Sequence, residues 1–211
     1  MNIHTAAVLA AGGAMLVTHG ASASHIDLFT EAPFFLNGGE TIVVAGSEDT
    51  ILGGQRRVSV DVVQANASVA SGGNVLEFNS VGTAAATLTL DYGSFPGGDP
   101  LNADFASEWA GIAVDFAQVL GGGLLTVRVQ GGGTSSQAVQ TFVNAAGTYA
   151  VPFTHPGFAG VDFADVDRVT ITLSGDPGSD FQISAIVLVV PAPGGFAGLA
   201  LAGLVVARRR R

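Results

Sequence analysis

The sequence predicts an all-β protein, a two-sheet antiparallel sandwich of jelly-roll-like form. Apolar and polar residues alternate along many short segments between residues 24 and 190, which places one face of each strand on a core and the other in water. Pairs and triplets of glycine separate these segments and mark turns. Helical periodicity is almost absent over the same range. A chain of 211 residues can bury such a core without disulfides, and it contains no cysteine.

We expect strands, in chain order, at 26–30, 41–45, 58–62, 75–79, 87–92, 112–116, 125–130, 137–143, 149–153, 168–174 and 181–190. The last segment is apolar on both sides, which is typical of a central strand that is covered on both faces, with a bulge. An alternative assigns 186–190 to a membrane segment. Pro191 and Pro193 interrupt that alternative, so we favour the strand.

Residues 1–23 form a helical N-terminal signal peptide in our interpretation. An apolar stretch at 6–17 has the length of a signal-peptide core, and Ala21 and Ala23 provide small residues at both recognition positions of a cleavage site. The sandwich domain is then 24–190.

Residues 191–211 have a different composition. Pro191, Ala192 and Pro193 end the domain, and an apolar run at 196–207 follows. As a helix this run spans roughly 18 Å, against about 30 Å for the hydrocarbon core of a bilayer, so we expect a marginal membrane anchor. The tail ends in four cations that act as a membrane stop on the cytoplasmic side: Arg208, Arg209, Arg210 and Arg211.

The tail resembles the PEP-CTERM sorting signal, which has a Pro-x-Pro motif, a short apolar segment and terminal arginines in this order. Ala192 stands where the family's motif has glutamate. The resemblance implies an exosortase-type membrane protease as a partner. It also implies an exported protein, first anchored in the inner membrane as a precursor and then located at the cell surface or outside the cell.

The body carries a second resemblance, to secreted PEP-CTERM proteins with a Leu-Gly-Gly-x-Arg motif, here residues 52–56. Its closing segments at 163–166, 169–173 and 181–188 are similar to the ends of carbohydrate-binding jelly rolls. Such modules often carry an aspartate near a structural calcium ion in the last strand, and Ser184 stands at that position here.

The net charge of the chain limits the classes of ligand that it can bind. Without its tail the chain has four arginines, no lysine and seventeen acidic residues, a formal net charge of −13. Such an acidic body argues against nucleic acid and anionic lipid as ligands. Arg56 and Arg57 stand at a strand start, and two interpretations remain open for them: contact with an anion or uronate, or a bond to a nearby carboxylate or carbonyl that fixes the loop.

Three further features are candidate sites. Asp162, Asp165 and Asp167 lie within six residues and offer oxygen ligands for a structural calcium ion, although solvated turn carboxylates are the commoner explanation for such a group. Trp109 and Tyr92 are candidate glycan contacts or core residues. We expect no other cofactor.

We expect no catalytic residues and no enzyme, because the sequence contains no nucleophile elbow, zinc-binding helix or phosphate-binding loop. The first hypothesis is an exported surface or extracellular-matrix protein with a structural or adhesive role. The alternative is a carbohydrate-binding module that is associated with extracellular polysaccharide. A secreted hydrolase is the third, because carboxylate pairs are arranged in space rather than in sequence.

Processing at both ends can be tested by mass spectrometry of the protein from cell envelope and medium. We expect a mature form that begins near Ser24 and ends near 191–195. A soluble cytoplasmic form that retains Arg211 would contradict export.

Overall fold

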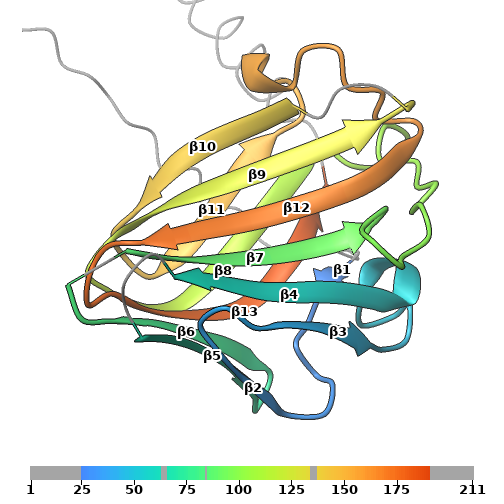
Figure 1. Ribbon diagram of the computed structural model, residues 1–211. Helices are drawn as coiled ribbons and strands as arrows, with labels where there is room; N and C mark the ends of the chain where they lie inside the picture. Colours follow the sequence, from blue (N-terminus) through green and yellow to red (C-terminus); the bar gives the residue numbers. More distant parts are fainter. Residues whose placement is uncertain (1–24, 63–65, 84, 134–136, 191–211) are drawn as a thin grey trace, which may run out of the picture. The chain divides into compact units, whose positions relative to one another are not determined.

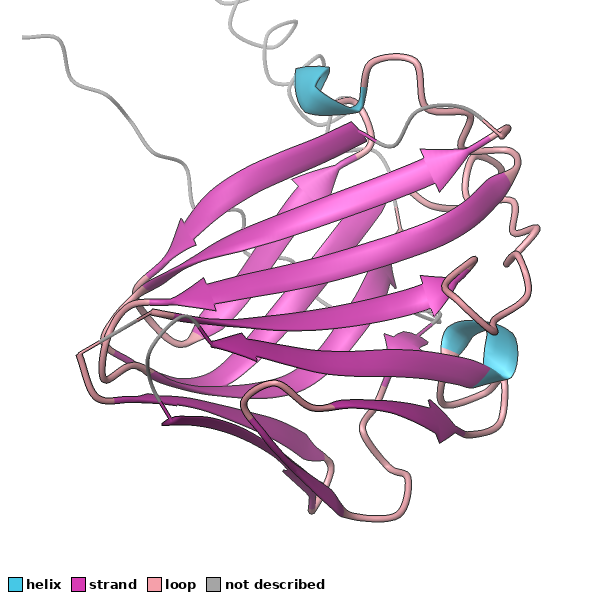
Figure 2. Ribbon diagram, viewed as in Figure 1, coloured by secondary structure: helices cyan, strands magenta, loops and turns pink. Residues whose placement is uncertain are grey.

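The computed structural model describes residues 25–62, 66–83, 85–133 and 137–190. It confirms the all-β prediction: two antiparallel sheets pack face to face as a sandwich (Figure 1 and Figure 2). Two short 3₁₀ turns, Leu52–Gly54 and Pro156–Phe158, interrupt the loops. The strands in the described residues are β1 (His25–Asp27), β2 (Phe34–Asn37), β3 (Thr41–Ala45), β4 (Gln55–Val62), β5 (Asn66–Gly72), β6 (Val75–Val81), β7 (Ala86–Gly93), β8 (Gly111–Leu120), β9 (Gly123–Gly131), β10 (Gln137–Val143), β11 (Gly147–Pro152), β12 (Val166–Gly175) and β13 (Asp180–Val189).

We call the seven-stranded sheet, with strand order β11-β8-β13-β6-β5-β2, sheet A; β1 also belongs to it through its pairing with β13. Sheet B has six strands in the order β10-β9-β12-β7-β4-β3. In Figure 1 sheet B lies toward the viewer, with its strands running across the molecule, and sheet A lies behind and below it. The core fills the space between the two inner faces.

The alternation in the sequence explains the core. On β4 the side chains of Val58 and Val60 are fully buried, whereas Ser59 between them is partly exposed. The inner face of sheet A adds an aromatic cluster, because the rings of Phe78 and Phe116 each lie 6.1 Å from the ring of Phe181, centroid to centroid. Full burial of each such side chain contributes about 1.5–3 kcal/mol to stability.

Most predicted strands are present, and the 41–45 and 137–143 segments have the predicted bounds. The last strand is central, as predicted, because β13 pairs with β8 on one side and with β6 and β1 on the other. Its register with β8 shifts on both sides of Ile183, at a β-bulge or a similar irregularity. Two strands were not predicted: β2 has four residues, and β5 consists mainly of small residues whose alternation is faint.

The predicted targeting features lie outside the described residues. These are the signal cleavage residues Ala21 and Ala23, the Pro191-Ala192-Pro193 motif, and the arginines from Arg208 to Arg211. Both expected terminal helices fall there as well. Within the described ranges, no helix is long and apolar enough to cross a membrane.

A buried charged cluster joins the two sheets at one end of the sandwich. The Arg56 side chain on β4 is fully buried and donates from Nη1 to Asp27 Oδ1 on β1 and to Glu31 Oε2, the latter at 3.0 Å. The Tyr92 hydroxyl on β7 donates to Asp27 Oδ2 at 2.7 Å. Since β1 belongs to sheet A and β4 and β7 to sheet B, these bonds cross the sandwich.

The residues around this cluster hold it in a fixed geometry. The Phe29 amide donates to Asp27 Oδ1 at 3.0 Å, which supports a left-handed backbone at Phe29 (φ 53°). The Arg56 guanidinium carbon lies 5.0 Å from the Phe29 ring centroid and 5.8 Å from that of Phe34. Burial raises the pKa of Asp27 above its ordinary value, although the charge of Arg56 and the bonds from Tyr92 and Phe29 oppose that rise.

Replacing Arg56 tests the importance of this cluster. Arg56→Met leaves the Asp27 carboxylate buried without its cation, and we expect the free energy of unfolding to fall by about 3–5 kcal/mol. Urea unfolding of the full chain measures this loss. Arg128→Met, at an exposed position, is the control and should change stability by less than about 0.5 kcal/mol. Equal unfolding midpoints for both variants would contradict the assigned role of the buried cluster.

Candidate functional site

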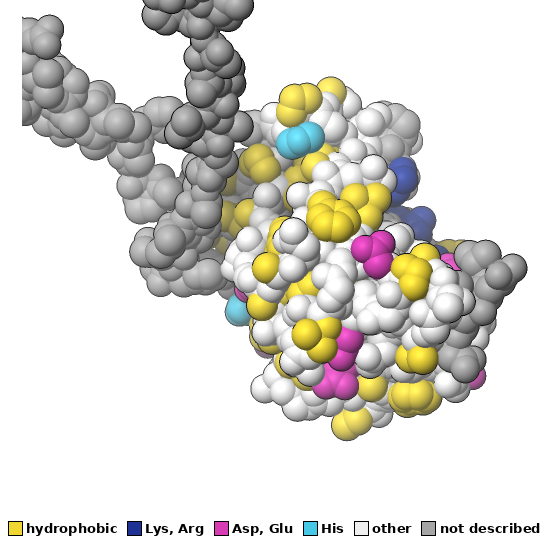
Figure 3. Space-filling model, turned by 90° about the vertical axis from the view of Figure 1, so that its left-hand side faces the viewer, with side chains coloured by type: hydrophobic (Ala, Val, Ile, Leu, Met, Phe, Trp, Pro, Cys, Tyr) yellow, Lys and Arg dark blue, Asp and Glu magenta, His cyan; other side chains and the backbone are white. Residues whose placement is uncertain are grey.

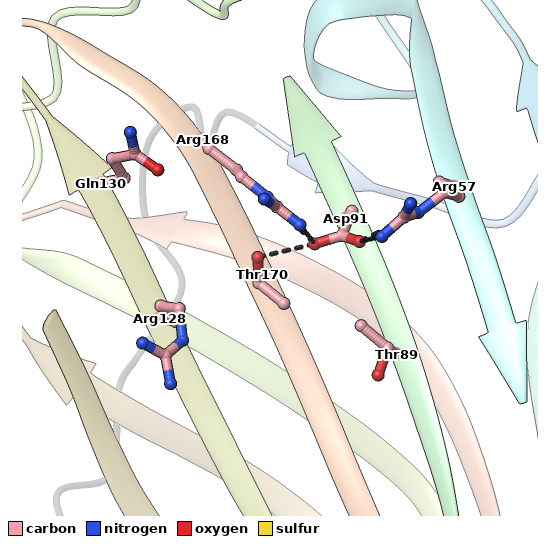
Figure 4. A pocket seen from close by; sticks show the side chains of 7 residues that line it. All are labelled: Arg57, Thr89, Asp91, Arg128, Gln130, Arg168 and Thr170. Atoms are coloured by element: carbon pink, nitrogen blue, oxygen red, sulfur yellow. Dashed lines mark hydrogen bonds and ion pairs between the residues drawn. The ribbon is translucent and has the colours of Figure 1, made fainter. Parts of the chain in front are cut away.

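A polar hollow of about 300 Å³ lies on the outer face of sheet B (Figure 4). Four neighbouring strands supply its side chains, because alternate residues of β4, β7, β12 and β9 point to the same face. The residues that line it are Arg57, Thr89, Asp91, Arg128, Gln130, Arg168 and Thr170.

Asp91 is at the centre of the hollow and is fully buried. From β4, Arg57 donates to Asp91 Oδ2 from Nη2 at 2.6 Å and from Nε at 3.2 Å. From β12, Arg168 donates to Asp91 Oδ1 with the same two distances, and the Thr170 hydroxyl donates to Oδ1 at 2.7 Å. One carboxylate therefore fixes two guanidinium groups on opposite sides of β7.

These bonds set the ionisation of Asp91. Burial alone would raise the pKa of this carboxyl. The hydrogen bonds from Thr170, Arg168 and Arg57, together with the charge of Arg168, outweigh burial and hold the pKa below its ordinary value. Asp91 is therefore a carboxylate at neutral pH, and it keeps the two arginines in place.

The strand register extends this arrangement into a row across sheet B. Ala138, Arg128, Thr170, Asp91, Arg57 and Val43 are direct cross-strand neighbours, from β10 to β3. We call this the charged row. A second row, two residues along each strand, has only hydroxyl and amide side chains, and we call it the polar row: Gln140, Thr126, Thr172, Thr89, Ser59 and Thr41. Neither Thr89 nor any other member of the polar row is buried.

One exposed aromatic ring shares this face. Phe142 on edge strand β10 is 58% exposed and pairs with Leu124, two residues along β9 from the polar row. Along β9, Leu124 lies four residues from Arg128, which corresponds to roughly 13 Å. The outer face of sheet B thus offers charge, hydroxyl groups and an aromatic ring over a distance longer than a single sugar ring.

The predicted aromatic contacts lie elsewhere. Tyr92 is fully buried in the core, and its hydroxyl bonds to Asp27. Burial takes its ring out of reach of a surface ligand. Trp109 is partly buried in the loop before β8, packs against the core and does not line the hollow. The sequence did not predict Phe142 as an exposed contact residue, because nothing in the sequence distinguishes it from the phenylalanines of the core.

The three aspartates proposed for calcium fix turns. Asp162 Oδ1 accepts from the Ala164 amide at 3.0 Å, and Asp167 Oδ2 accepts from the Gly133 amide at 3.1 Å. Asp165 contributes its backbone carbonyl, which accepts from the Gly132 amide. Among the described residues, no group of three or more such side chains is arranged to hold a metal ion. Calcium binding stays a prediction.

Arg56 and Arg57 have different roles. They are adjacent on one strand and point to opposite faces, so Arg56 enters the core and Arg57 lines the hollow. The structure therefore assigns the loop-fixing interpretation to Arg56. The Gly53 and Gly54 backbones before this strand are left-handed (φ 73° and 69°), which explains the glycine pair in the motif.

Asp91, Arg128 and Arg168 were not predicted as a site. Alternation places each of them on a polar face, but their proximity depends on the pairing of β9 and β7 with β12. Arg168 and Asp91 are 77 residues apart in the chain. The only signal in the sequence was the scarcity of arginine, which makes three outward arginines in one body unusual.

No protein-family model and no curated protein matches this sequence. Several solved structures align with it. The family 11 carbohydrate-binding module of the cellulosomal cellulase Lic26A-Cel5E of Clostridium thermocellum is 13% identical, with a TM-score of 0.42, over 82% of this chain and 97% of the module. A CBM4 structure is 13% identical, with a TM-score of 0.38, over 80% of this chain and 99% of its own. An exo-β-agarase is 11% identical, with a TM-score of 0.43, over 64% of this chain and 23% of its own.

The Asp91 cluster gives a pH-dependent prediction. In acid the native carboxyl binds its proton less readily than the unfolded one, so stability falls as pH drops from about 4 through the lowered pKa. The Asp91→Asn variant lacks this carboxyl, and its free energy of unfolding at neutral pH should be lower than that of the wild type by about 2–3 kcal/mol. This loss is smaller than that for breaking a fully buried ion pair, because Arg57 and Arg168 keep contact with water.

Urea unfolding of both proteins at neutral pH and in steps below pH ~4 measures the difference in stability. We expect the gap between wild type and Asp91→Asn to narrow as pH falls. A gap that is constant over the whole range would contradict a lowered pKa of Asp91.

Proposed function

We propose that the sandwich domain binds polysaccharide on the outer face of sheet B and acts as an exported, non-enzymatic binding module. The observation that carries this proposal is the polar hollow and the two rows that extend across all six strands. We also infer that the sandwich is of the jelly-roll type, because the chain alternates repeatedly between the sheets from β7 to β13.

The chemistry of this face suits a sugar chain. A sugar hydroxyl both donates and accepts hydrogen bonds, and the threonine, serine and glutamine side chains of the polar row do the same. Sites for small drug-like molecules are mostly apolar, whereas this hollow is lined by polar and charged side chains. A long, hydrated ligand that lies across the strands fits it better.

Phe142 adds an apolar surface for the less polar face of a sugar ring. Its exposed ring lies on the same face as the polar row and costs little conformational entropy on binding, since an aromatic side chain has few rotatable bonds. A comparable exposed ring, Phe35, lies on β2 of the opposite sheet. This pair of residues allows a matched comparison.

We retain the prediction that the protein is not an enzyme. Glycoside hydrolysis needs two carboxyl groups about 5–10 Å apart. Among the described residues that line the hollow, Asp91 is the single carboxylate, and two arginines and a threonine occupy its oxygens. It is buried and committed to these bonds, which suits a positioning role.

The cellular setting is part of the proposal and rests on the sequence. A signal peptide at 1–23 and a sorting tail at 191–211 would place the domain outside the inner membrane, where polysaccharide is available. Binding there would give the structural or adhesive role that the composition of the chain suggests. Processing by an exosortase-type protease remains a prediction.

The Phe142 and Phe35 pair tests the binding face. Phe142→Ala should weaken polysaccharide binding by about tenfold, equivalent to ~1.4 kcal/mol, because it removes the ring from the sheet B face. Phe35→Ala removes an equally exposed ring from sheet A and should leave affinity unchanged.

Isothermal titration of the full chain against a panel of neutral and acidic polysaccharides gives both affinities. Absence of binding to every member of the panel would sink the proposal. Equal loss in both variants would contradict the assignment of the binding face.

A further inference from the structure

The arginines of the sandwich domain are concentrated at one place. Of the four in the body, Arg56 is buried in the core, and the other three line the hollow: Arg57, Arg128 and Arg168. The same body carries seventeen acidic residues and no lysine. In Figure 3 Asp and Glu side chains are visible across the viewed face, whereas dark blue basic side chains occur only at its right-hand margin. The hollow is thus a positive site on a strongly acidic molecule.

The charges that line the hollow do not balance. Three guanidinium groups and one carboxylate, Asp91, line the hollow, which gives a formal charge of +2 among the lining side chains. Bringing like charges together on neighbouring strands is unfavourable. A fold that needed only to neutralise Asp91 could do so with one arginine and the Thr170 hydroxyl.

The arginines are also held ready to bind. The Asp91 carboxylate accepts hydrogen bonds from Nε and Nη2 of both Arg57 and Arg168. The Nη1 atom of each guanidinium forms no hydrogen bond with the described residues. Their side chains are 24% and 28% exposed. The Arg57 guanidinium carbon also lies over the Phe95 ring, 5.8 Å from its centroid. Fixed planar guanidinium groups recognise oxyanions with little loss of entropy.

We infer that the hollow binds an acidic polysaccharide, with the carboxylate or sulfate groups of the sugars held by Arg57, Arg128 and Arg168. This inference rests on the proposed polysaccharide-binding function and adds the charge of the ligand. Arg168 and the two arginines of the charged row hold the anionic group, and the polar row contacts the hydroxyl groups of the same chain. The −13 charge of the body then repels polyanions everywhere except at this face.

The test is titration of the full chain with three probes: alginate, which carries carboxylates, dextran sulfate, and neutral dextran. We expect alginate or dextran sulfate to bind at least tenfold more tightly than dextran, with affinity falling as salt rises. A preference for either acidic probe supports the inference and identifies the anionic group.

Two variants separate the site from net charge. Arg128→Gln removes a cation from the hollow without touching the bonds to Asp91, and it should weaken binding of the acidic probe by about threefold to tenfold. Ala150→Glu changes the net charge by the same amount on an exposed position of β11, in sheet A, and should have little effect. Circular dichroism and the urea midpoint check that both variants fold.

The outcomes distinguish the two proposals. Binding of dextran as tightly as the acidic probes would overturn this inference and leave polysaccharide binding intact. Equal effects of Arg128→Gln and Ala150→Glu would indicate non-specific attraction and would also overturn it. If no probe binds and the wider panel of neutral and acidic polysaccharides fails as well, both proposals fall.

Discussion

The bond between Arg56 and Asp27 is the constraint on which the arrangement of this sandwich depends. It places a guanidinium beside two carboxylates in an otherwise apolar interior, where loss of the pairing would leave an uncompensated buried charge. The match requires β1 to lie against β13 while β4 and β7 lie opposite in sheet B. We infer that this buried pair helps to specify the alignment of the two sheets, because valine contacts alone are compatible with many alignments. The charged cluster thus sets how β4 lies, and β4 in turn presents Arg57 to the outer face.

Much of the fold could be predicted, because alternation is a local property. The 41–45 and 137–143 segments match their strands, and the two-sided apolar pattern at the end of the chain indicates the central position of β13. Local patterns fail where side chains are small, as in β5, or where a strand is very short, as in β2. Each of these strands is recognisable from its pairing with a neighbour, β2 with β5 and β5 with β6.

The site could be predicted only in part. The sequence indicates that Arg57, Asp91 and Arg168 face outward, since each lies on the polar side of its strand. Their meeting depends on register, and a slip of one residue between β12 and β7 would turn every side chain of one strand to the other face. Buried tyrosine and exposed phenylalanine also reverse the usual expectation for polar and apolar rings. The buried Tyr92 hydroxyl donates a hydrogen bond to Asp27, and Phe142 is exposed because it lies on the outer face of sheet B, whereas its neighbour Val143 faces the core.

The place of β13 has a mechanical consequence. This strand is hydrogen-bonded to β8 on one side and to β6 and β1 on the other, and it is the last strand of the described domain. A pulling force applied beyond Val190 would act along β13 and would have to shear its bonds to both sides at once, rather than peel an edge strand away one bond at a time. The sandwich is therefore built to resist extension when it is tethered at its C-terminal end.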